Sequence, residues 1–526
     1  MKNIRINIII LIVAILSMSS CVKEFLDISP EDSITTAMFP KSEGDMKMLL
    51  NGVYASLRET ELYNQGLFGF GALDGATPNA YNWADGMVIN NLGKGNLLSS
   101  SAGVVTYKWT RAYRIINRAN FLLNIIDEVE LSENVKNLYI GEAHFLRGLA
   151  YSKLVEAYGG VPILPMELST TVEALNLSRA SVEETWAQVE ADCDVAISRL
   201  GINAPETGRA TKGAALALKM RASLFQKKYQ ETINLADEIE ALGKYALFPS
   251  YEGLFMAENE NNVEVIFDIQ YMEGENDQGT YLDQYNGTGT GSWTRGSRYV
   301  PTDHLVNAYE NIDGSPTVPF NPNDRTTWEG RDPRLAFTVV LPHSFILGHQ
   351  FPNYLYPGGA FNHAGNALKH LGTRKYRVQD EDKLPPAGQS YINYIVLRYA
   401  DILLSKAEAL IESGGDVSAA IALMNRIRTE RNDVKISALP TNLSREEARE
   451  KLRNERRIEF ALEGFYWDDI RRWDICDDIY PLNILDHNGN IIERRFPNGY
   501  QRQYQLLPIP DSERSMNSNL TQNPGW

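Results

Sequence analysis

Cysteine is scarce in this chain, which has three cysteines among 526 residues. Cys21 follows an apolar N-terminal segment, so only Cys193 and Cys476 belong to the rest of the sequence. Two thiols in a chain of this length do not make a disulfide framework. Cys193 lies in a helical pattern and is expected to be a buried free thiol, although the sequence leaves a bridge to Cys476 open.

The chain also lacks an excess of basic residues. Its 51 Lys and Arg against 67 Asp and Glu give a formal net charge of -16, and the pI is about 5.1. An acidic surface repels phosphate groups, which argues against nucleic acid as a partner. Uncharged ligands such as sugars are neither favoured nor excluded by this charge.

Motifs for catalysis and for metal binding are missing as well. The sequence has no His-Glu-x-x-His, no Gly-x-Ser-x-Gly and no phosphate-binding loop. Its seven His residues are scattered without the spacing of zinc ligands. Residues 486–490, DHNGN, resemble a calcium loop but are not followed by a Gly at its sixth position or by a Glu at its end. They predict an Asn-Gly turn instead. We therefore expect no metal, no cofactor and no enzymatic activity, although two carboxylates distant in sequence would be enough for a glycosidase.

Long apolar runs are absent apart from one near the N-terminus. Two basic residues precede an apolar run at 6–16, and small residues then lead to Cys21. The run is too short to stay in a bilayer, which takes about 20 apolar residues. This order predicts a lipoprotein signal peptide at 1–20, an acylated Cys21 and an N-terminal tether at 21–40. An ordinary cleaved signal peptide with an incidental cysteine is the alternative.

The rest of the chain, 41–526, is predicted to form a single body organised around one helix. Apolar residues recur with a helical period through 138–164. Small residues on the same face, Gly148 among them, leave room for a second helix to approach closely. Gly159 and Gly160 then end the helical pattern.

Helical hairpins occur in two blocks, at about 107–243 and 395–465. Small and aromatic residues at 213–242 resemble the packing positions of tetratricopeptide repeats, but the spacing does not hold the period of about 34 residues. Between the blocks, about 246–394 is rich in Gly, Pro, Asn and Tyr and has one convincing strand at 263–269. We predict a predominantly α fold, with tetratricopeptide-like helical hairpins as a frame and a loop-rich insertion containing a few short strands.

Basic and acidic residues alternate through 452–473. The basic residues are Arg453, Arg456, Arg457, Arg471 and Arg472. Their spacing of three or four positions from Glu or Asp predicts an ion-pair lattice that ties the last helix to its neighbours. An anion site or a surface for docking a partner is the alternative.

Two segments without helical periodicity, 74–83 (DGATPNAYNW) and 274–299, combine aromatic side chains with short polar ones. A sugar ring has an apolar C–H face and a rim of hydroxyls, so its recognition takes a flat aromatic surface beside Asp, Asn or Arg groups. The alternative is that these aromatics fill the underside of their own loops. The predicted ligand contacts are Asp74, Asn79, Tyr81, Trp83, Tyr281, Tyr285, Trp293, Arg295 and Trp328.

Motifs in three separated parts of the chain resemble those of a known family. They are FLRGLAYSKLVEAYGGVPIL at 145–164, RDPRL at 331–335, and LRNERRIEFALEGFYWDDIRRW at 452–473 with the terminal LPIP and QNPGW. In this order they resemble the SusD-like (RagB/SusD) family of outer-membrane nutrient-binding lipoproteins. The resemblance covers essentially the whole chain after Cys21.

The resemblance implies a protein anchored in the outer membrane through its N-terminal lipid and facing the exterior. It implies that the protein captures an oligo- or polysaccharide, in loops of the two aromatic segments, and delivers it to a SusC-like TonB-dependent transporter. Peptide binding, as in the RagB branch, keeps the architecture and changes the ligand. Besides peptide binding and the enzyme considered above, a repeat scaffold that binds only proteins is a further alternative.

Overall fold

The structure is a computed structural model in which part of the chain is described. The predicted signal peptide, Cys21 and nearly all of the predicted tether lie outside that part. The described residues are 40–59, 62–63, 70–82, 88–166, 176–274, 278–282, 299–346, 349–350, 371–386, 388–486 and 488–526.

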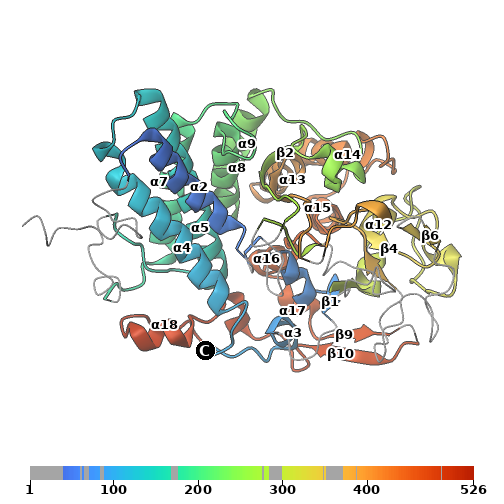
Figure 1. The fold of residues 1–526 in the computed structure, drawn as a ribbon. Coiled ribbons are helices and arrows are strands. Elements are labelled where there is room, and N and C mark those ends of the chain that lie inside the picture. Colours follow the sequence, from blue (N-terminus) through green and yellow to red (C-terminus); the bar gives the residue numbers. More distant parts are fainter. Residues whose placement is uncertain are drawn as a thin grey trace, which may run out of the picture.

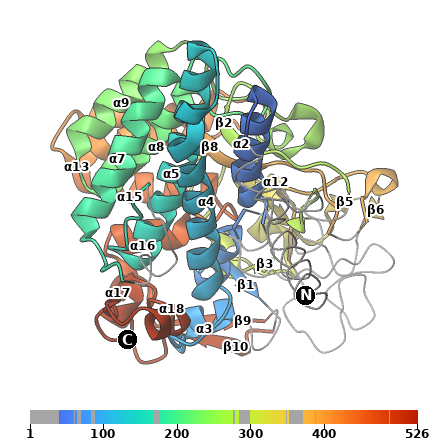
Figure 2. The ribbon, with the colours of Figure 1, turned by 60° about the vertical axis from the view of Figure 1, so that its left-hand side comes forward.

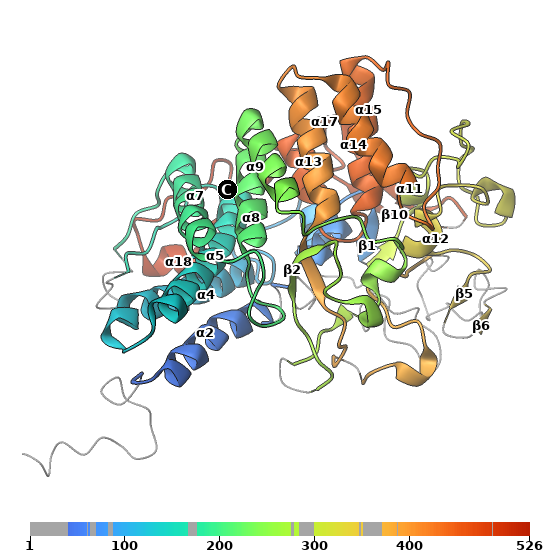
Figure 3. The same cartoon turned by 90° about the horizontal axis from the view of Figure 1, so that it is seen from above.

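Helical hairpins make up the frame, as predicted (Figure 1). In the first block α5 packs against α4 and α7, and α8 packs against α7 and α9. In the second block α13 packs against α14 and α15, and it joins the blocks by packing on α9. Figure 3 shows these helices succeeding one another across the molecule. Their bounds are α2 (Glu43–Leu57), α4 (Thr106–Ile125), α5 (Glu133–Tyr158), α7 (Val182–Arg199), α8 (Lys212–Phe225), α9 (Tyr229–Ala241), α13 (Tyr399–Glu412), α14 (Val417–Thr429) and α15 (Arg445–Glu459).

The local sequence explains where these helices begin and end. The Ser-x-x-Glu sequences that begin at Ser181 and Ser444 form capping boxes at the start of α7 and α15, each Ser accepting a hydrogen bond from the backbone of the Glu three residues later. The central helix α5 ends at Gly159, whose φ of 75° is costly for residues with a side chain. A Cβ on Gly148 would lie 3.1 Å from the Asp192 Cβ, which confirms that a small residue allows α5 and α7 to approach closely.

The insertion between the blocks contains short elements, and strands outside it pair with them. β2 (Val265–Ile269) pairs antiparallel with β8 (Tyr394–Arg398), so the ends of the insertion lie together on the frame. Four further two-stranded sheets are described, all antiparallel. They are β1 (Ala80–Asn82) with β3 (Tyr299–Pro301), β4 (Val339–Val340) with β7 (Gly372–Thr373), β5 (Phe345–Ile346) with β6 (His349–Gln350), and β9 (Leu482–Leu485) with β10 (Ile491–Arg495).

Short helices complete the described part of the chain. The α-helical ones are α3 (Val88–Lys94), α11 (Asp303–Val306), α12 (Arg334–Thr338), α16 (Tyr466–Arg472), α17 (Cys476–Ile479) and α18 (Asp511–Met516). The 3-10 helices are η2 (Phe70–Ala76), η3 (Ile126–Glu128), η4 (Gly253–Phe255), η5 (Ala257–Asn259), η7 (Arg325–Thr327), η8 (Glu381–Lys383) and η9 (Arg502–Gln505).

Two hydrophobic clusters support this arrangement. The larger one runs through the helical frame and includes the buried faces of α4, α5, α8 and α13. The smaller one, which we call the second core, joins the insertion to the end of α15 through Ile458. Its buried members are Ala80, Val300, Leu305, Val306, Tyr309, Phe320, Trp328, Leu335, Val339, Leu341, Leu371, Ile458, Ala461 and Leu462.

A buried set of charges, which we call the central ion network, also connects the insertion to the frame. Its centre is Glu459 of α15, whose carboxylate lies 2.8 Å from Arg334, 2.7 Å from Arg398 and 2.9 Å from Arg431. Arg334 belongs to α12 in the insertion, whereas Arg398 ends β8 and Arg431 follows α14. The buried members of the network are Arg334, Lys375, Arg398, Arg428, Arg431, Asp332, Glu264, Glu455, Glu459 and Glu463.

Both cysteines of the folded body are free thiols. Cys193 and Cys476 are buried, at 0% and 1% exposure, and no bridge joins them. The prediction of a buried free thiol at Cys193 is therefore confirmed. Within the described ranges, no helix is both long enough and apolar enough to cross a membrane.

Candidate functional site

The two predicted ligand-binding segments meet in one small sheet. β1 belongs to the first segment and β3 follows the second, and they pair antiparallel with Asn82 opposite Tyr299. Because the strands run in opposite directions, β1 ends and β3 begins at the same end of the pair. Segments about 210 residues apart in sequence are thus joined at one point of the fold (Figure 2).

Four of the predicted contacts lie outside the described residues: Trp83, Tyr285, Trp293 and Arg295. In the sequence, Trp83 directly follows Asn82, and Trp293 precedes Tyr299 by six residues. Their contact with a ligand stays a prediction. The β1–β3 pair supports it, because this pair joins the described ends of the two segments.

A third segment is attached at the same place, which the sequence did not indicate. The hydroxyl of Thr373 in β7 donates a hydrogen bond to the Tyr299 carbonyl at 2.8 Å. The chain enters β7 from 351–370, a stretch with Tyr354, Tyr356 and Asn362 that also lies outside the described part.

Asp74 and Asn79 point into the protein. The Asp74 carboxylate accepts hydrogen bonds from the Gly464 N–H at 2.8 Å and from the Asn79 amide at 3.3 Å. The Asn79 carbonyl oxygen accepts one from Arg457 of α15 at 2.7 Å. At 1% and 0% exposure these side chains attach the turn before β1 to the frame, and neither offers a polar atom to solvent in this structure.

Arg495 of β10 reinforces the same turn from the other side. Its side chain is fully buried and donates to the carbonyls of Gly75 at 2.9 Å and Ala80 at 2.8 Å, and also to that of Thr77. Sequence reasoning did not identify this residue, because nothing in a short hairpin distinguishes an inward-pointing Arg from an exposed one. These hydrogen bonds hold the backbone of residues 75–80, just before and at the start of β1, in a fixed position.

The remaining described aromatics differ in exposure. Tyr81 is 8% exposed and packs with Ile484 of β9, while Trp328 is 7% exposed and lies 5.4 Å from Phe320 in the second core. Tyr281 is half-buried against Gly388, where an added Cβ would lie 2.9 Å from its ring. Of these three, only Tyr281 has substantial surface available to a ligand in this structure.

The buried carboxyl of Asp74 should make stability depend on pH. Burial raises its pKa to about 7, against hydrogen bonds from Gly464 and Asn79 that lower it. The unfolded chain releases this proton near pH 4, so the folded state holds the extra proton between about pH 4 and pH 7. Stability from this group is therefore complete below about pH 4 and is lost as the pH rises through about 7. The urea midpoint of Asp74→Asn, which cannot titrate, should fall less between about pH 5 and pH 8 than that of the wild type.

The difference between the wild type and Asp74→Asn separates the contribution of Asp74 from those of the other titrating groups. Burial also raises the pKa of Glu260 to about 7 and that of Asp268 to about 6, and both groups titrate in the variant as well. Parallel curves for the wild type and Asp74→Asn would contradict the assignment.

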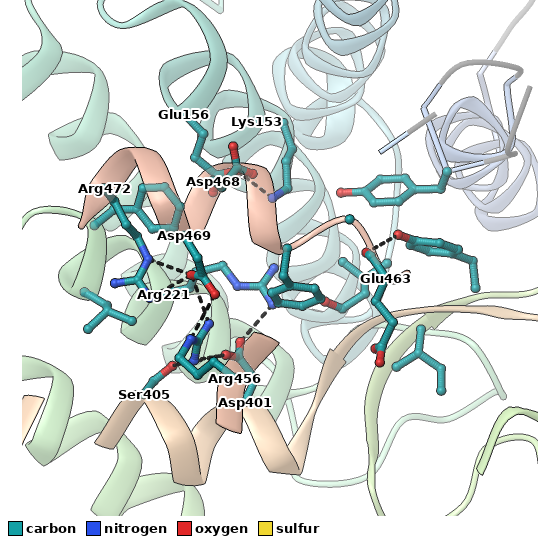
Figure 4. A pocket seen from close by; sticks show the side chains of 18 residues that line it. Lys153, Glu156, Arg221, Asp401, Ser405, Arg456, Glu463, Asp468, Asp469 and Arg472 are labelled. Carbon is teal, nitrogen blue, oxygen red and sulfur yellow. Dashed lines mark hydrogen bonds and ion pairs between the residues drawn. The ribbon is translucent and has the colours of Figure 1, made fainter. Parts of the chain in front are cut away.

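Three of the five basic residues of 452–473, Arg456, Arg471 and Arg472, form ion pairs of the predicted lattice. Arg457 instead donates to Asn79 and to the His304 carbonyl, and Arg453 lies over the Trp473 ring. Figure 4 shows the side chains that line a small cavity where α5, α8, α13 and α16 meet. Its volume is about 40 Å³, which suits a water or two. Arg456 lies 3.1 Å from both Asp401 and Asp469, and Arg472 pairs with Glu408 and Asp469. These side chains are buried, so the lattice interpretation is confirmed and the cavity is too small for a sugar. Among all the residues that the structure describes, no group of three or more His, Cys, Asp or Glu could hold a metal ion.

Comparisons with known proteins bear on the whole chain. A family model described as the SusD family matches residues 263–526, and one described as starch-binding and associating with the outer membrane matches residues 24–224. SusD-like protein P2 of Formosa agariphila is 27% identical over 543 residues, with 100% of both chains covered. A SusD-like protein of Bacteroides fragilis is 27% identical with a TM-score of 0.79, covering 95% of this chain and 100% of its own. A SusD-like carbohydrate-binding protein of the same organism is 26% identical with a TM-score of 0.78, covering 91% and 99%.

These matches agree with the sequence and with the fold. The motifs at 145–164, 331–335 and 452–473 all fall within the matched regions. The solved relatives superpose over nearly the whole chain, including both helical blocks and the insertion. The protein belongs to the SusD family.

Proposed function

We propose that this protein binds a glycan at the outer cell surface and delivers it to a SusC-like TonB-dependent transporter. The β1–β3 pair carries the proposal, because it joins the ends of the two segments whose aromatic and amide side chains suit a sugar. The match of 24–224 to a starch-binding, outer-membrane-associating family supports both the ligand class and the location. A relative of similar structure is itself named as carbohydrate-binding.

In this proposal the protein captures its ligand and releases it without bond chemistry. Aromatic rings stack on the apolar face of the sugar, and amide, guanidinium and carboxylate groups bind its hydroxyls. Asn79 and Arg495 hold the start of the site rigidly, which reduces the entropy lost on binding. Cleavage of the glycan belongs to separate enzymes, and import belongs to the transporter.

A glycan array and a peptide library test the ligand class directly. We expect the wild-type protein to retain at least one polysaccharide, with starch and laminarin among the first probes, and to bind no peptide. Binding of peptides alone would favour an oligopeptide importer of the RagB type. New reducing ends in a bound glycan would identify an enzyme, and co-purification with a TonB-dependent transporter tests the delivery step.

The lipid anchor is tested at Cys21, which lies outside the described residues. We expect Cys21→Ser to abolish membrane association while leaving the melting temperature unchanged, because the acyl chains and not the fold hold the protein on the membrane. A single acyl chain binds only reversibly, so stable retention takes several chains. Cell fractionation should be done in a strain without the transporter. Retention of Cys21→Ser in the outer-membrane fraction there would exclude lipid anchoring.

A further inference from the structure

A second hollow lies at the other end of the molecule from β4 and β6. We call it the α4 groove. It runs between α4, the segment 162–164 after α5, and the C-terminal segment 513–520, and it encloses about 390 Å³. Figure 1 shows α18 at one end of the frame and β4 and β6 at the opposite end. The volume falls in the range of about 300–1,000 Å³ that is typical of small-ligand sites.

The floor of the α4 groove is aromatic and held in place. Tyr113 lies with its ring 5.0 Å from that of Trp109, and its hydroxyl donates to the Pro162 carbonyl at 2.8 Å. Leu164 and Leu520 extend the apolar surface. Tyr113 is only partly buried, so this ring is both fixed and accessible.

Polar groups line the two rims. On α4, Asn117 follows Tyr113 by four residues and therefore lies on the same face of the helix. Its side chain is exposed and makes no hydrogen bond within the described chain. Arg118 makes its hydrogen bonds to described residues through Nη1, which donates to the Gly52 carbonyl at 2.8 Å and to the Ser56 hydroxyl at 2.6 Å.

Glu513 forms the opposite rim. Burial raises the pKa of its carboxyl, which accepts a hydrogen bond from the Trp109 indole. No cation pairs with Glu513 among the residues that the structure describes. The groove thus presents a carboxyl oxygen on one side and amide and guanidinium N–H groups on the other, above an aromatic floor.

We infer that the α4 groove is a second saccharide-binding site. An apolar chain in the groove would leave the Asn117 amide without a partner and would desolvate the Glu513 carboxyl with only the Trp109 indole to bind it, which is costly. A simple anion is less suited, because it would meet the Glu513 carboxyl on one rim, while Arg114 on the other rim already pairs with Glu59 and Arg118 already donates to Gly52 and Ser56. A sugar ring satisfies both conditions, since its C–H face covers Tyr113 while its hydroxyls donate to the carboxyl and accept from the amide. This inference rests on the proposed function and adds a second contact for the same polymer, which would raise avidity for long chains.

Thiol labelling can detect occupancy of the α4 groove directly. Cys193 and Cys476 are buried, so a full-length protein carrying Cys21→Ser should react slowly with N-ethylmaleimide. Adding Asn117→Cys places one reactive thiol on the rim. A polysaccharide retained by the wild type on the array is then titrated while labelling is followed. At ten times the Kd that this titration gives for the groove, labelling should be about eleven-fold slower, because about one groove in eleven is then free. Asn124→Cys, exposed on the same helix but outside the groove, should be labelled at an unchanged rate.

A conservative variant gives a second readout. Asn117→Ala should weaken binding of that polysaccharide about five-fold in affinity electrophoresis, the effect expected of one lost hydrogen bond, whereas Asn124→Ala should not. Suppose that the protein binds the polysaccharide, but that the polysaccharide does not slow labelling of Asn117→Cys and that Asn117→Ala binds it with unchanged affinity. This result would overturn the second site and leave the proposed function standing. An array on which the wild type retains no glycan would overturn the proposed function, and the second site with it.

Discussion

Replacing Glu459 by Gln should lower the free energy of unfolding by about 3–5 kcal/mol, the cost of breaking a buried ion pair. Glu459 has no exposed surface, and its carboxylate lies against Arg334, Arg398 and Arg431. Burial alone would raise the pKa of Glu459, but the three guanidinium groups hold it well below its usual range. The variant leaves these three cations buried with one negative charge fewer.

The size of this effect comes from three buried guanidinium groups that lose a shared partner at once, although each keeps another carboxylate, Asp332 for Arg334 and Glu264 for Arg398 and Arg431. Exchanging a whole buried ion pair for apolar residues is often neutral, whereas removal of one partner leaves a charge in a medium that solvates it poorly. Here one carboxylate serves cations from the insertion, from β8 and from the loop after α14. Its loss should therefore weaken the attachment of the insertion to the frame together with overall stability.

Urea unfolding followed by far-UV circular dichroism and by tryptophan fluorescence measures this loss. Glu430→Gln is the matched control, since Glu430 pairs with Arg426 on the surface of the frame and is about half exposed at 46%. Exposed pairs contribute about 0–1 kcal/mol, so the control should unfold close to the wild-type midpoint. Equal midpoints for Glu459→Gln and Glu430→Gln would show that the network does not hold the insertion in place.

Local signals in the sequence were sufficient to predict the helical frame. Capping boxes at Ser181 and Ser444 and the stop at Gly159 are properties of neighbouring residues, and the structure has each of them where the pattern indicates. The alternation of charges after residue 452 likewise follows from helical spacing. The single strand predicted at 263–269 is β2, whose residues are mostly apolar and β-branched.

The site was harder to predict because its geometry depends on distant contacts. Asp74 reaches a partner 390 residues away, and Asn79 reaches one 378 residues away. No local pattern separates such inward-pointing polar residues from exposed ones, so composition alone made both look like ligand contacts. β1 and β3 have three residues each, too few for a periodic signal, and yet their pairing joins the two segments.

Removal of Trp83 or Trp293 should weaken glycan binding by about 1–3 kcal/mol, a factor of about ten to a hundred in Kd, because the sugar face is then exposed to water again. Both residues remain predicted platforms of one shared cleft. The pairing of Asn82 with Tyr299 supports that prediction, since it brings together the described ends of the two segments. Trp83→Ala and Trp293→Ala should leave the melting temperature nearly unchanged, because an exposed ring contributes little to the core.

Trp328→Ala provides the contrast within the same chain. Trp328 is 7% exposed in the second core, so its removal should cost about 3–5 kcal/mol of stability. Calorimetric titration with the retained polysaccharide and thermal unfolding should be measured for all three variants. A large fall in melting temperature with unchanged affinity would assign Trp83 or Trp293 to the interior. The ligand would then have to be held by Tyr281 and Tyr285 among the predicted contacts, because Asp74, Asn79 and Tyr81 already make contacts inside the protein.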